Sequence, residues 1–207
     1  MKFLREKLNL RIYQQTILDK SINQNTLCVI PTGLGKTYIA VALSSIILKQ
    51  GKVLMVAPTK PLVNQHKITF DEFFEHKKEI ISITGTTPAK DREKIYSNAK
   101  IIIATPQTIK HDILAGRIDL KEFKLLIFDE AHRAIGDYAY VSIAKYFAKI
   151  KTNRILALTA SPGADQDKIK EICANLHISN IELRNKTHPE VEPFVKPILT
   201  KYEFIEL

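Results

Sequence analysis

The stretch Thr26-Leu27-Cys28-Val29-Ile30-Pro31-Thr32-Gly33-Leu34-Gly35-Lys36-Thr37 decides how this chain is expected to fold. An apolar run over residues 26–30 enters a short loop with two glycines, and an amphipathic segment over residues 38–49 follows. This order is typical of a strand, a phosphate-binding loop and a helix. Glycines let backbone N–H groups approach phosphate oxygens closely, and a helix N-terminus adds unpaired N–H groups and a positive dipole end. We expect Lys36 to reach the β- and γ-phosphates and the Thr37 hydroxyl to bind Mg²⁺.

One position of the loop departs from the general pattern. G-x-x-x-x-G-K-[ST] has a small residue where this chain has Ile30, and Pro31-Thr32-Gly33 then tightens the turn. An ordinary strand–turn–helix segment that contains Gly-Lys-Thr by chance would have the same sequence pattern. The phosphate-binding interpretation is favoured because both the flanking strand and the flanking helix are predicted.

The composition indicates a globular protein with a basic surface. The chain has 207 residues, of which 45% are hydrophobic, and a formal net charge of +9 with a pI near 9.4. Its length suits one large α/β domain or two small ones. The excess of positive charge favours a polyanionic partner, with nucleic acid as the first candidate. A solvated lysine-rich surface without such a partner would have the same net charge.

The cysteines and the apolar runs bear on the cellular compartment. Cys28 and Cys173 are the only cysteines, and their separation fits neither a disulfide framework nor a zinc site, so a reducing cytosol is expected. Residues 1–6 have no apolar core, so we expect no signal peptide, and no apolar run approaches the length of a membrane span. The sequence therefore predicts a cytoplasmic, nucleoid-associated protein with no membrane partner.

Apolar runs and helical patterns alternate along the chain. Continuous apolar runs such as Ile101-Ile102-Ile103 are typical of strands buried on both faces of a parallel sheet. This alternation predicts an α/β fold, an open, mostly parallel sheet with helices on both faces. The predicted strands are residues 26–30, 53–57, 80–84, 100–104, 125–128, 155–158 and, more weakly, 180–184. The predicted helices are residues 11–22, 36–49, 60–74, 89–98, 107–115, 137–149 and 165–176.

The end of the chain has a different character. Residues 188–197 contain three prolines and mixed charge, which predicts an extended connection, and residues 198–207 have a strand-like alternation. We expect residues 1–187 to form one domain and residues 188–207 to lead toward another domain, so the sequence is interpreted as a piece of a longer protein.

Two adjacent carboxylates follow a predicted strand. Residues 125–128 run into Asp129-Glu130-Ala131-His132. Ligands of such sheets bind beyond the carboxyl ends of the strands. We expect Asp129 to hold Mg²⁺ and Glu130 to orient or deprotonate the attacking water. A strand that ends in a charged turn is a common alternative, but the phosphate loop in the same chain favours hydrolysis. His132 alone would more often be structural, although its position after Glu130 allows a coupling role.

Four further strand ends run into loops rich in threonine, glycine and proline. Such loops, with helix N-termini behind them, can present hydroxyl and N–H groups to a sugar–phosphate backbone. Each loop alone is more often an ordinary turn, whereas their joint placement along one edge favours contacts with nucleic acid. These loops are residues 58–62, 85–87, 105–108 and 159–163.

Together these motifs resemble the first motor domain of superfamily 2 helicases of the DEAH-box type. The resemblance covers nearly the whole chain and implies a RecA-like P-loop NTPase fold. Within the superfamily it is strongest to the archaeal Hef, Fanconi anaemia M protein and Mph family, which tolerates an apolar residue at Ile30 and remodels branched DNA. The Dicer and RIG-I group, which acts on double-stranded RNA, remains an alternative. The motifs are Gln14, residues 30–37, 58–62, 105–107, 129–134 and 158–163, with Glu190-Val191-Glu192-Pro193-Phe194-Val195 at the end.

The resemblance implies a role for each matching residue. Gln14, with Arg11 nearby, would read the adenine of ATP, although a solvated helix residue is the alternative for Gln14. ATP contacts are implied at Arg11, Gln14, Ile30, Pro31, Thr32, Gly33, Leu34, Gly35, Lys36 and Thr37. Catalysis is implied for Glu130, Lys36 and Asp129, and Mg²⁺ binding for Thr37 and Asp129. Nucleic-acid contacts are implied at Thr59, Lys60, Gly85, Thr105 and Gln107, and coupling at His132, Thr159 and Ser161.

A second RecA-like domain is the expected partner. The arginines of that domain stabilise the transferring phosphoryl group in this superfamily, and no stretch of this chain resembles their motif. We therefore expect this piece to bind ATP weakly and to hydrolyse it slowly. Branched or forked DNA is the favoured substrate and RNA is possible. A regulatory module that reports the ATP state is a further alternative, against which the intact Glu130 argues.

Overall fold

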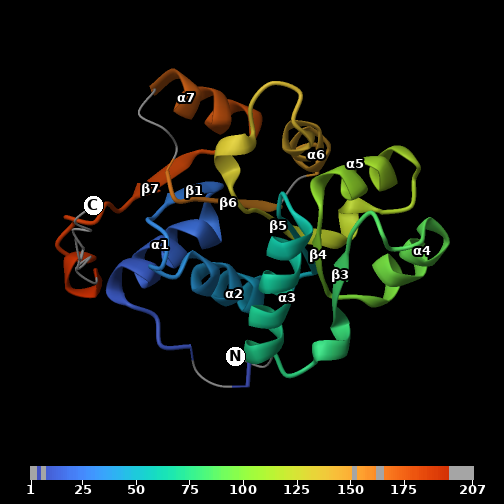
Figure 1. Cartoon of the computed structure of the whole chain (residues 1–207), viewed down its shortest axis with the longest axis horizontal. Coiled ribbons are helices and arrows are strands. Elements are labelled where there is room, and N and C mark those ends of the chain that lie inside the picture. Colours follow the sequence, from blue (N-terminus) through green and yellow to red (C-terminus); the bar gives the residue numbers. More distant parts are fainter. Residues whose placement is uncertain (1–3, 6–7, 151–152, 162–165, 196–207) are drawn as a thin grey trace, which may run out of the picture.

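The fold is a single sheet of seven parallel strands between two layers of helices (Figure 1). The computed structural model describes residues 4–5, 8–150, 153–161 and 166–195. The strand order across the sheet is β3-β4-β2-β5-β6-β1-β7, and every ladder is parallel. The predicted α/β class is confirmed. The strands are β1 (Thr26–Val29), β2 (Lys52–Val56), β3 (Ile80–Ile83), β4 (Ile101–Ala104), β5 (Phe123–Phe128), β6 (Arg154–Thr159) and β7 (Asn180–Leu183).

The helices divide between the two faces of the sheet. Alternate residues of each strand point to opposite faces, so each strand supplies both apolar cores. Cys28 and Ile127 lie in the core under α1, α2 and α3, whereas Leu27 and Phe128 lie in the core under α4, α5, α6 and α7. The helices are α1 (Ile12–Asn23), α2 (Lys36–Ile47), α3 (Lys60–Phe73), α4 (Ala89–Asn98), α5 (Pro106–Leu114), α6 (Ala139–Phe147) and α7 (Gln166–Asn175).

The predicted elements are all present, with small differences at their ends. β5 begins earlier than predicted because Phe123 pairs with Lys52, and Lys124 then lies at an irregularity of the register. β6 begins one residue earlier because Arg154 pairs with Leu125. α6 is shorter than predicted and begins at Ala139, since residues 135–138 form a turn. Despite these differences, the carboxyl ends of all seven strands lie at the same edge of the sheet.

The register of the central strands determines which loops meet. Val29 pairs with Thr159, and Ala157 pairs with Phe128, so β1, β6 and β5 end side by side. Because all strands are parallel, the loops that follow them lie along the carboxyl edge of the sheet. The loop after β1, the residues after β6 and the Asp129-Glu130 pair are therefore neighbours.

The expected extended connection is not extended where the structure describes it. Residues 186–191 form turns and Glu192–Phe194 form a short 3₁₀ helix. Val191 is fully buried, and Arg184 of the preceding segment pairs with Glu190 at 3.0 Å. Residues 188–195 thus fold back onto the domain. The predicted strand-like segment, residues 198–207, lies outside the described residues, and the domain boundary at residue 187 stays a prediction.

Among the helices that the structure describes, none combines the length and the apolar composition needed to cross a bilayer.

Replacing Ile127 by alanine should strongly destabilise the fold, because this side chain is fully buried in the central strand β5. Removal of a buried isoleucine side chain costs about 2–5 kcal/mol of the free energy of unfolding. The matched control is Ile181→Ala in the edge strand β7, where the side chain is 48% exposed, and this change should cost less than about 1 kcal/mol. Urea denaturation measures both values, and equal losses would show that the core is wrongly placed.

Candidate functional site

The loop between β1 and α2 has the backbone conformation of a phosphate-binding loop. Gly33 and Gly35 have φ angles of 82° and 80°, in the left-handed region that favours glycine. Within the described residues, the backbone N–H groups of Gly33, Gly35, Lys36 and Thr37 donate hydrogen bonds to no protein acceptor. Four donors around one turn, at the start of a helix, fit the oxygens of a polyphosphate.

Helix α1 braces this loop from behind. The Tyr13 hydroxyl donates to the Leu34 carbonyl at 2.7 Å, and Gln14 Nε2 donates to the carbonyls of Leu34 and Gly35 at 3.2 and 3.4 Å. A Cβ atom on Gly35 would lie 2.5 Å from Gln14 Nε2, so a side chain there would displace the Gln14 amide from these hydrogen bonds. The loop carbonyls are thus satisfied by α1, and the loop amides remain available on the other side.

Gln14 is buried, so it is not the solvated helix residue that was the alternative interpretation. Its side chain is only 4% exposed, and its Oε1 accepts a hydrogen bond from the Arg11 backbone N–H at 2.9 Å. Both ends of the amide therefore contact protein, and its role as a reader of adenine stays a prediction. Arg11 lies with its guanidinium 4.1 Å above the Phe194 ring and donates to the Tyr13 hydroxyl.

Two hollows flank the loop and share Arg11. One, of about 330 Å³, is lined by Asn9, Gln14 and Tyr38 as well as the loop. The other, of about 280 Å³, is lined by the loop together with Lys186, Phe194 and Val195. Each is large enough to take the base and sugar of a nucleotide whose phosphates bind the loop amides.

Lys36 lies between the loop and the two carboxylates. Its Nζ donates to the Ile30 carbonyl at 2.9 Å. Burial lowers the pKa of Lys36, whereas the negative charges of Asp129 and Glu130 act in the opposite direction. A cation beside two carboxylates, at the rim of a ring of amide donors, suits a bound phosphate with its metal ion.

Asp129 is held rigidly at the end of β5. The side chain is 5% exposed and accepts a hydrogen bond from His66 Nε2 at 2.7 Å, while the Tyr140 hydroxyl donates to the Asp129 carbonyl at 2.7 Å. Burial raises the pKa of Tyr140 well above its usual range, so its hydroxyl stays a donor. These contacts fix the Asp129 carboxylate at the end of β5, and carboxylate and hydroxyl oxygens such as those of Asp129 and Thr37 are of the kind that Mg²⁺ prefers as ligands. Mg²⁺ binding by these two residues stays a prediction.

The predicted coupling residues meet at Glu130. Glu130 has a left-handed backbone, with φ of 50°, at the start of a 3₁₀ turn. His132 Nδ1 lies 3.2 Å from both Glu130 Oε2 and Thr159 Oγ1, and the Thr159 hydroxyl donates to the Ser161 carbonyl at 3.0 Å. The end of β6 is thereby connected to the carboxylate after β5.

The residues expected to contact nucleic acid lie along the other half of the same edge. Thr59 precedes α3, Gly85 follows β3 and Thr105 precedes α5, beyond the ends of β2, β3 and β4. Thr59, Lys60, Gly85 and Gln107 are exposed, and Thr105 is half-buried. The edge therefore divides into a β5-β6-β1 half with the loop and a β3-β4-β2 half with these residues.

Three site residues were not predicted from the sequence: Tyr13, His66 and Tyr140. His66 lies on the buried face of α3 with Val63 and Phe70, and this i, i+3, i+7 spacing is the signal that could have identified it. Tyr13 and Tyr140 are large polar side chains within apolar helical patterns, where a hydroxyl requires a buried partner.

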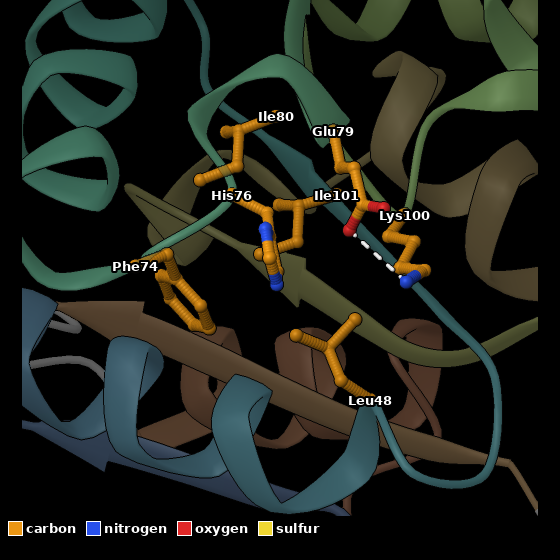
Figure 2. Close-up of a pocket in the computed structure, with 7 residues that line it drawn as sticks. All are labelled: Leu48, Phe74, His76, Glu79, Ile80, Lys100 and Ile101. Carbon is orange, nitrogen blue, oxygen red and sulfur yellow. Dashed lines mark ion pairs between the residues drawn. The ribbon is translucent and has the colours of Figure 1, made fainter. Parts of the chain in front are cut away.

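A small crevice lies at the opposite edge of the sheet. Figure 2 shows His76 among Leu48, Phe74, Ile80 and Ile101, with the Glu79–Lys100 ion pair beside them. The two charged groups of the pair lie 3.0 Å apart. Ile80 and Ile101 are the first residues of their strands, so the crevice is at the amino edge. Its volume of about 10 Å³ would hold no more than a water molecule, and it is not part of the site.

Comparisons with known proteins agree with this geometry. A family described as the res subunit of type III restriction enzymes matches residues 7–164. A protein of Methanocaldococcus jannaschii, provisionally named an ATP-dependent RNA helicase, is 47% identical over 194 residues, which are 92% of this chain and 25% of that protein. The ATP-dependent DNA helicase MPH1 of Saccharomyces cerevisiae is 39% identical over 193 residues, 90% of this chain and 19% of the relative.

A solved structure shares the fold. The Hef helicase domain of Pyrococcus furiosus superimposes with a TM-score of 0.89 and 48% identity, covering 95% of this chain and 43% of that one. The chain spans a quarter or less of the length of the two curated relatives above. The chain belongs to the family of the type III restriction enzyme res subunit, and the predicted resemblance to the first motor domain of superfamily 2 helicases is confirmed.

Gly35→Ala should destabilise the protein more than Gly33→Ala. Both substitutions place a side chain at a positive φ, which costs about 1–2 kcal/mol, but only the Cβ of residue 35 collides with Gln14, whereas that of residue 33 meets open space. We expect the loss at position 35 to be larger by about 1–3 kcal/mol. Thermal unfolding of the two variants measures the difference. Equal losses would contradict the brace between α1 and the loop.

Proposed function

We propose that this chain is the ATP-binding motor domain of an ATP-dependent helicase or translocase that acts on branched or forked DNA. The observation that carries the proposal is the meeting of three features at one edge: the loop amides, Lys36 and the Asp129-Glu130 pair. The names of MPH1 and of the DEAD-box ATP-dependent DNA helicase Fancm of Drosophila melanogaster support DNA as the substrate. A cytoplasmic, nucleoid-associated location accords with this function.

The residues of the loop would bind the triphosphate. The amides of Gly33, Gly35, Lys36 and Thr37 would hold the β- and γ-phosphates, and Lys36 would exchange its contact with the Ile30 carbonyl for a phosphate oxygen. The Thr37 hydroxyl and the Asp129 carboxylate would hold Mg²⁺, which neutralises the charge on the phosphates when it is bound. His66 would keep the Asp129 side chain in place.

Glu130 would orient the attacking water and accept its proton. Its side chain is 30% exposed and contacts His132, so the carboxylate is accessible to water. His132 and Thr159 would link hydrolysis to the residues after β6. The exposed residues on the β3-β4-β2 half would contact the sugar–phosphate backbone, and arginines of a second RecA-like domain would complete the hydrolytic site. We therefore expect slow turnover by this chain alone.

RNA is the second candidate substrate, because the relative from Methanocaldococcus jannaschii carries a provisional RNA helicase name. Phosphate contacts carry little information about the sugar, whereas recognition of the 2′-OH separates the two. Competition between forked DNA and duplex RNA for this chain decides the question. Preference for forked DNA supports the proposal, and preference for RNA contradicts it.

Lys36→Ala should weaken ATP binding by about 10–100-fold, because a charged donor to a phosphate oxygen contributes about 1.5–3 kcal/mol. Glu130→Gln should retain binding within about threefold, because Glu130 acts on the water and not on the phosphates. Lys49→Ala, which removes an exposed lysine in the turn after α2, is the matched control for charge. Titration with a fluorescent ATP analogue and Mg²⁺ gives the affinities. If Lys36→Ala binds like Lys49→Ala, the loop is not a phosphate site.

A further inference from the structure

A buried ionic cluster lies behind the turn that follows β3. Asp112 of α5 is fully buried, and Tyr96 of α4 donates to its Oδ2 at 2.5 Å. Arg92 of α4 donates to both carboxylate oxygens at 3.1 and 3.3 Å, and Arg117 donates to Oδ1 at 3.1 Å. The cluster therefore fixes α4 against α5 with one fully paired carboxylate.

Arg92 makes one contact that Arg117 does not make. Its Nε donates to the carbonyl of Thr87 at 2.9 Å, while its NH1 binds Asp112. The planar guanidinium thus connects the buried carboxylate with the backbone of the turn, at a fixed angle. The Arg92 side chain is only 11% exposed, so it acts inside the protein rather than at the surface.

The turn itself, residues 84–87, presents backbone donors. It is closed by a hydrogen bond from the Thr87 N–H to the Thr84 carbonyl at 2.9 Å, and by a hydroxyl contact between Thr84 and Thr86. Gly85 and Thr86 are exposed, and within the described ranges their N–H groups donate to no protein acceptor. Thr105, before α5, donates its N–H to the Ile83 carbonyl, so the turn adjoins the start of α5.

We propose that Arg92, anchored on Asp112, is a positioning residue that holds the turn of residues 84–87 so that the amides of Gly85 and Thr86 bind a phosphate of the nucleic-acid backbone. The inference rests on the proposed function, because it assigns a nucleic-acid phosphate to these amides. Tyr96 and Arg117 already donate hydrogen bonds to Asp112, so pairing of this buried carboxylate does not by itself require Arg92. Holding the turn gives Arg92 a separate role.

The test compares Arg92→Gln with Arg117→Gln. Each variant removes one guanidinium and one positive charge from the same carboxylate, but only Arg92→Gln releases the carbonyl of Thr87. Hydrogen–deuterium exchange is measured first, without nucleic acid. We expect faster exchange within residues 84–87 in Arg92→Gln and wild-type exchange there in Arg117→Gln. Equal exchange in the two variants would overturn the positioning role.

Binding of a forked DNA oligonucleotide is then measured at several salt concentrations. We expect Arg92→Gln to lose about 5–30-fold in affinity, as for one or two hydrogen bonds to a charged phosphate, and Arg117→Gln to lose less than about twofold. The salt slope of Arg92→Gln should equal that of the wild type, since no phosphate-neutralising cation is lost. A slope reduced by about 1 would show that Arg92 contacts phosphate itself and would overturn the inference.

The two proposals fail in different ways. If the wild-type chain binds no forked DNA, the proposed function and the phosphate role of the turn fail together, while the exchange data still decide whether Arg92 holds the turn. If wild-type binding is normal and both variants bind alike, the inference fails and the proposed function stands.

Discussion

The contact of α1 with the loop after β1 is the constraint on which the site depends. A phosphate-binding loop needs its amides free and its carbonyls satisfied, and these groups alternate along one backbone. Tyr13 and Gln14 satisfy the carbonyls, because their side chains donate hydrogen bonds to the carbonyl oxygens of Leu34 and Gly35. The positive φ at Gly35, together with the space that Gln14 occupies behind it, makes the arrangement specific to glycine.

The parallel register extends this constraint to the rest of the carboxyl edge. β6 separates β1 from β5, so the loop and Asp129-Glu130 face each other across the end of one strand, whose Thr159 contacts His132. His66 joins the two halves of the edge, because it binds Asp129 and belongs to α3, the helix that begins at Lys60. A shift of α3 on binding nucleic acid would therefore act directly on the carboxylate assigned to Mg²⁺, which is a physical basis for coupling.

Much of this structure was predictable because its signals are local. The strands other than β7 contain apolar runs, and the spacing of Gly33, Gly35 and Lys36 identifies the loop within eight residues. The pairs His66–Asp129 and Tyr13–Leu34 join residues far apart in the chain, so no local pattern reveals them. The fold of residues 188–195 was also missed, because three prolines favour extension while burial of Val191 depends on the whole domain.

We propose that the edge formed by β1, β6 and β5 binds a nucleotide. Titration of the ¹⁵N-labelled chain with ADP and Mg²⁺, followed through backbone amide chemical shifts, tests it most directly. We expect saturable changes that are largest at residues 32–38 and 129–130, with smaller changes at His132 and Thr159. Absence of saturable changes, or changes centred on His76 and Lys100 at the opposite edge, would contradict it.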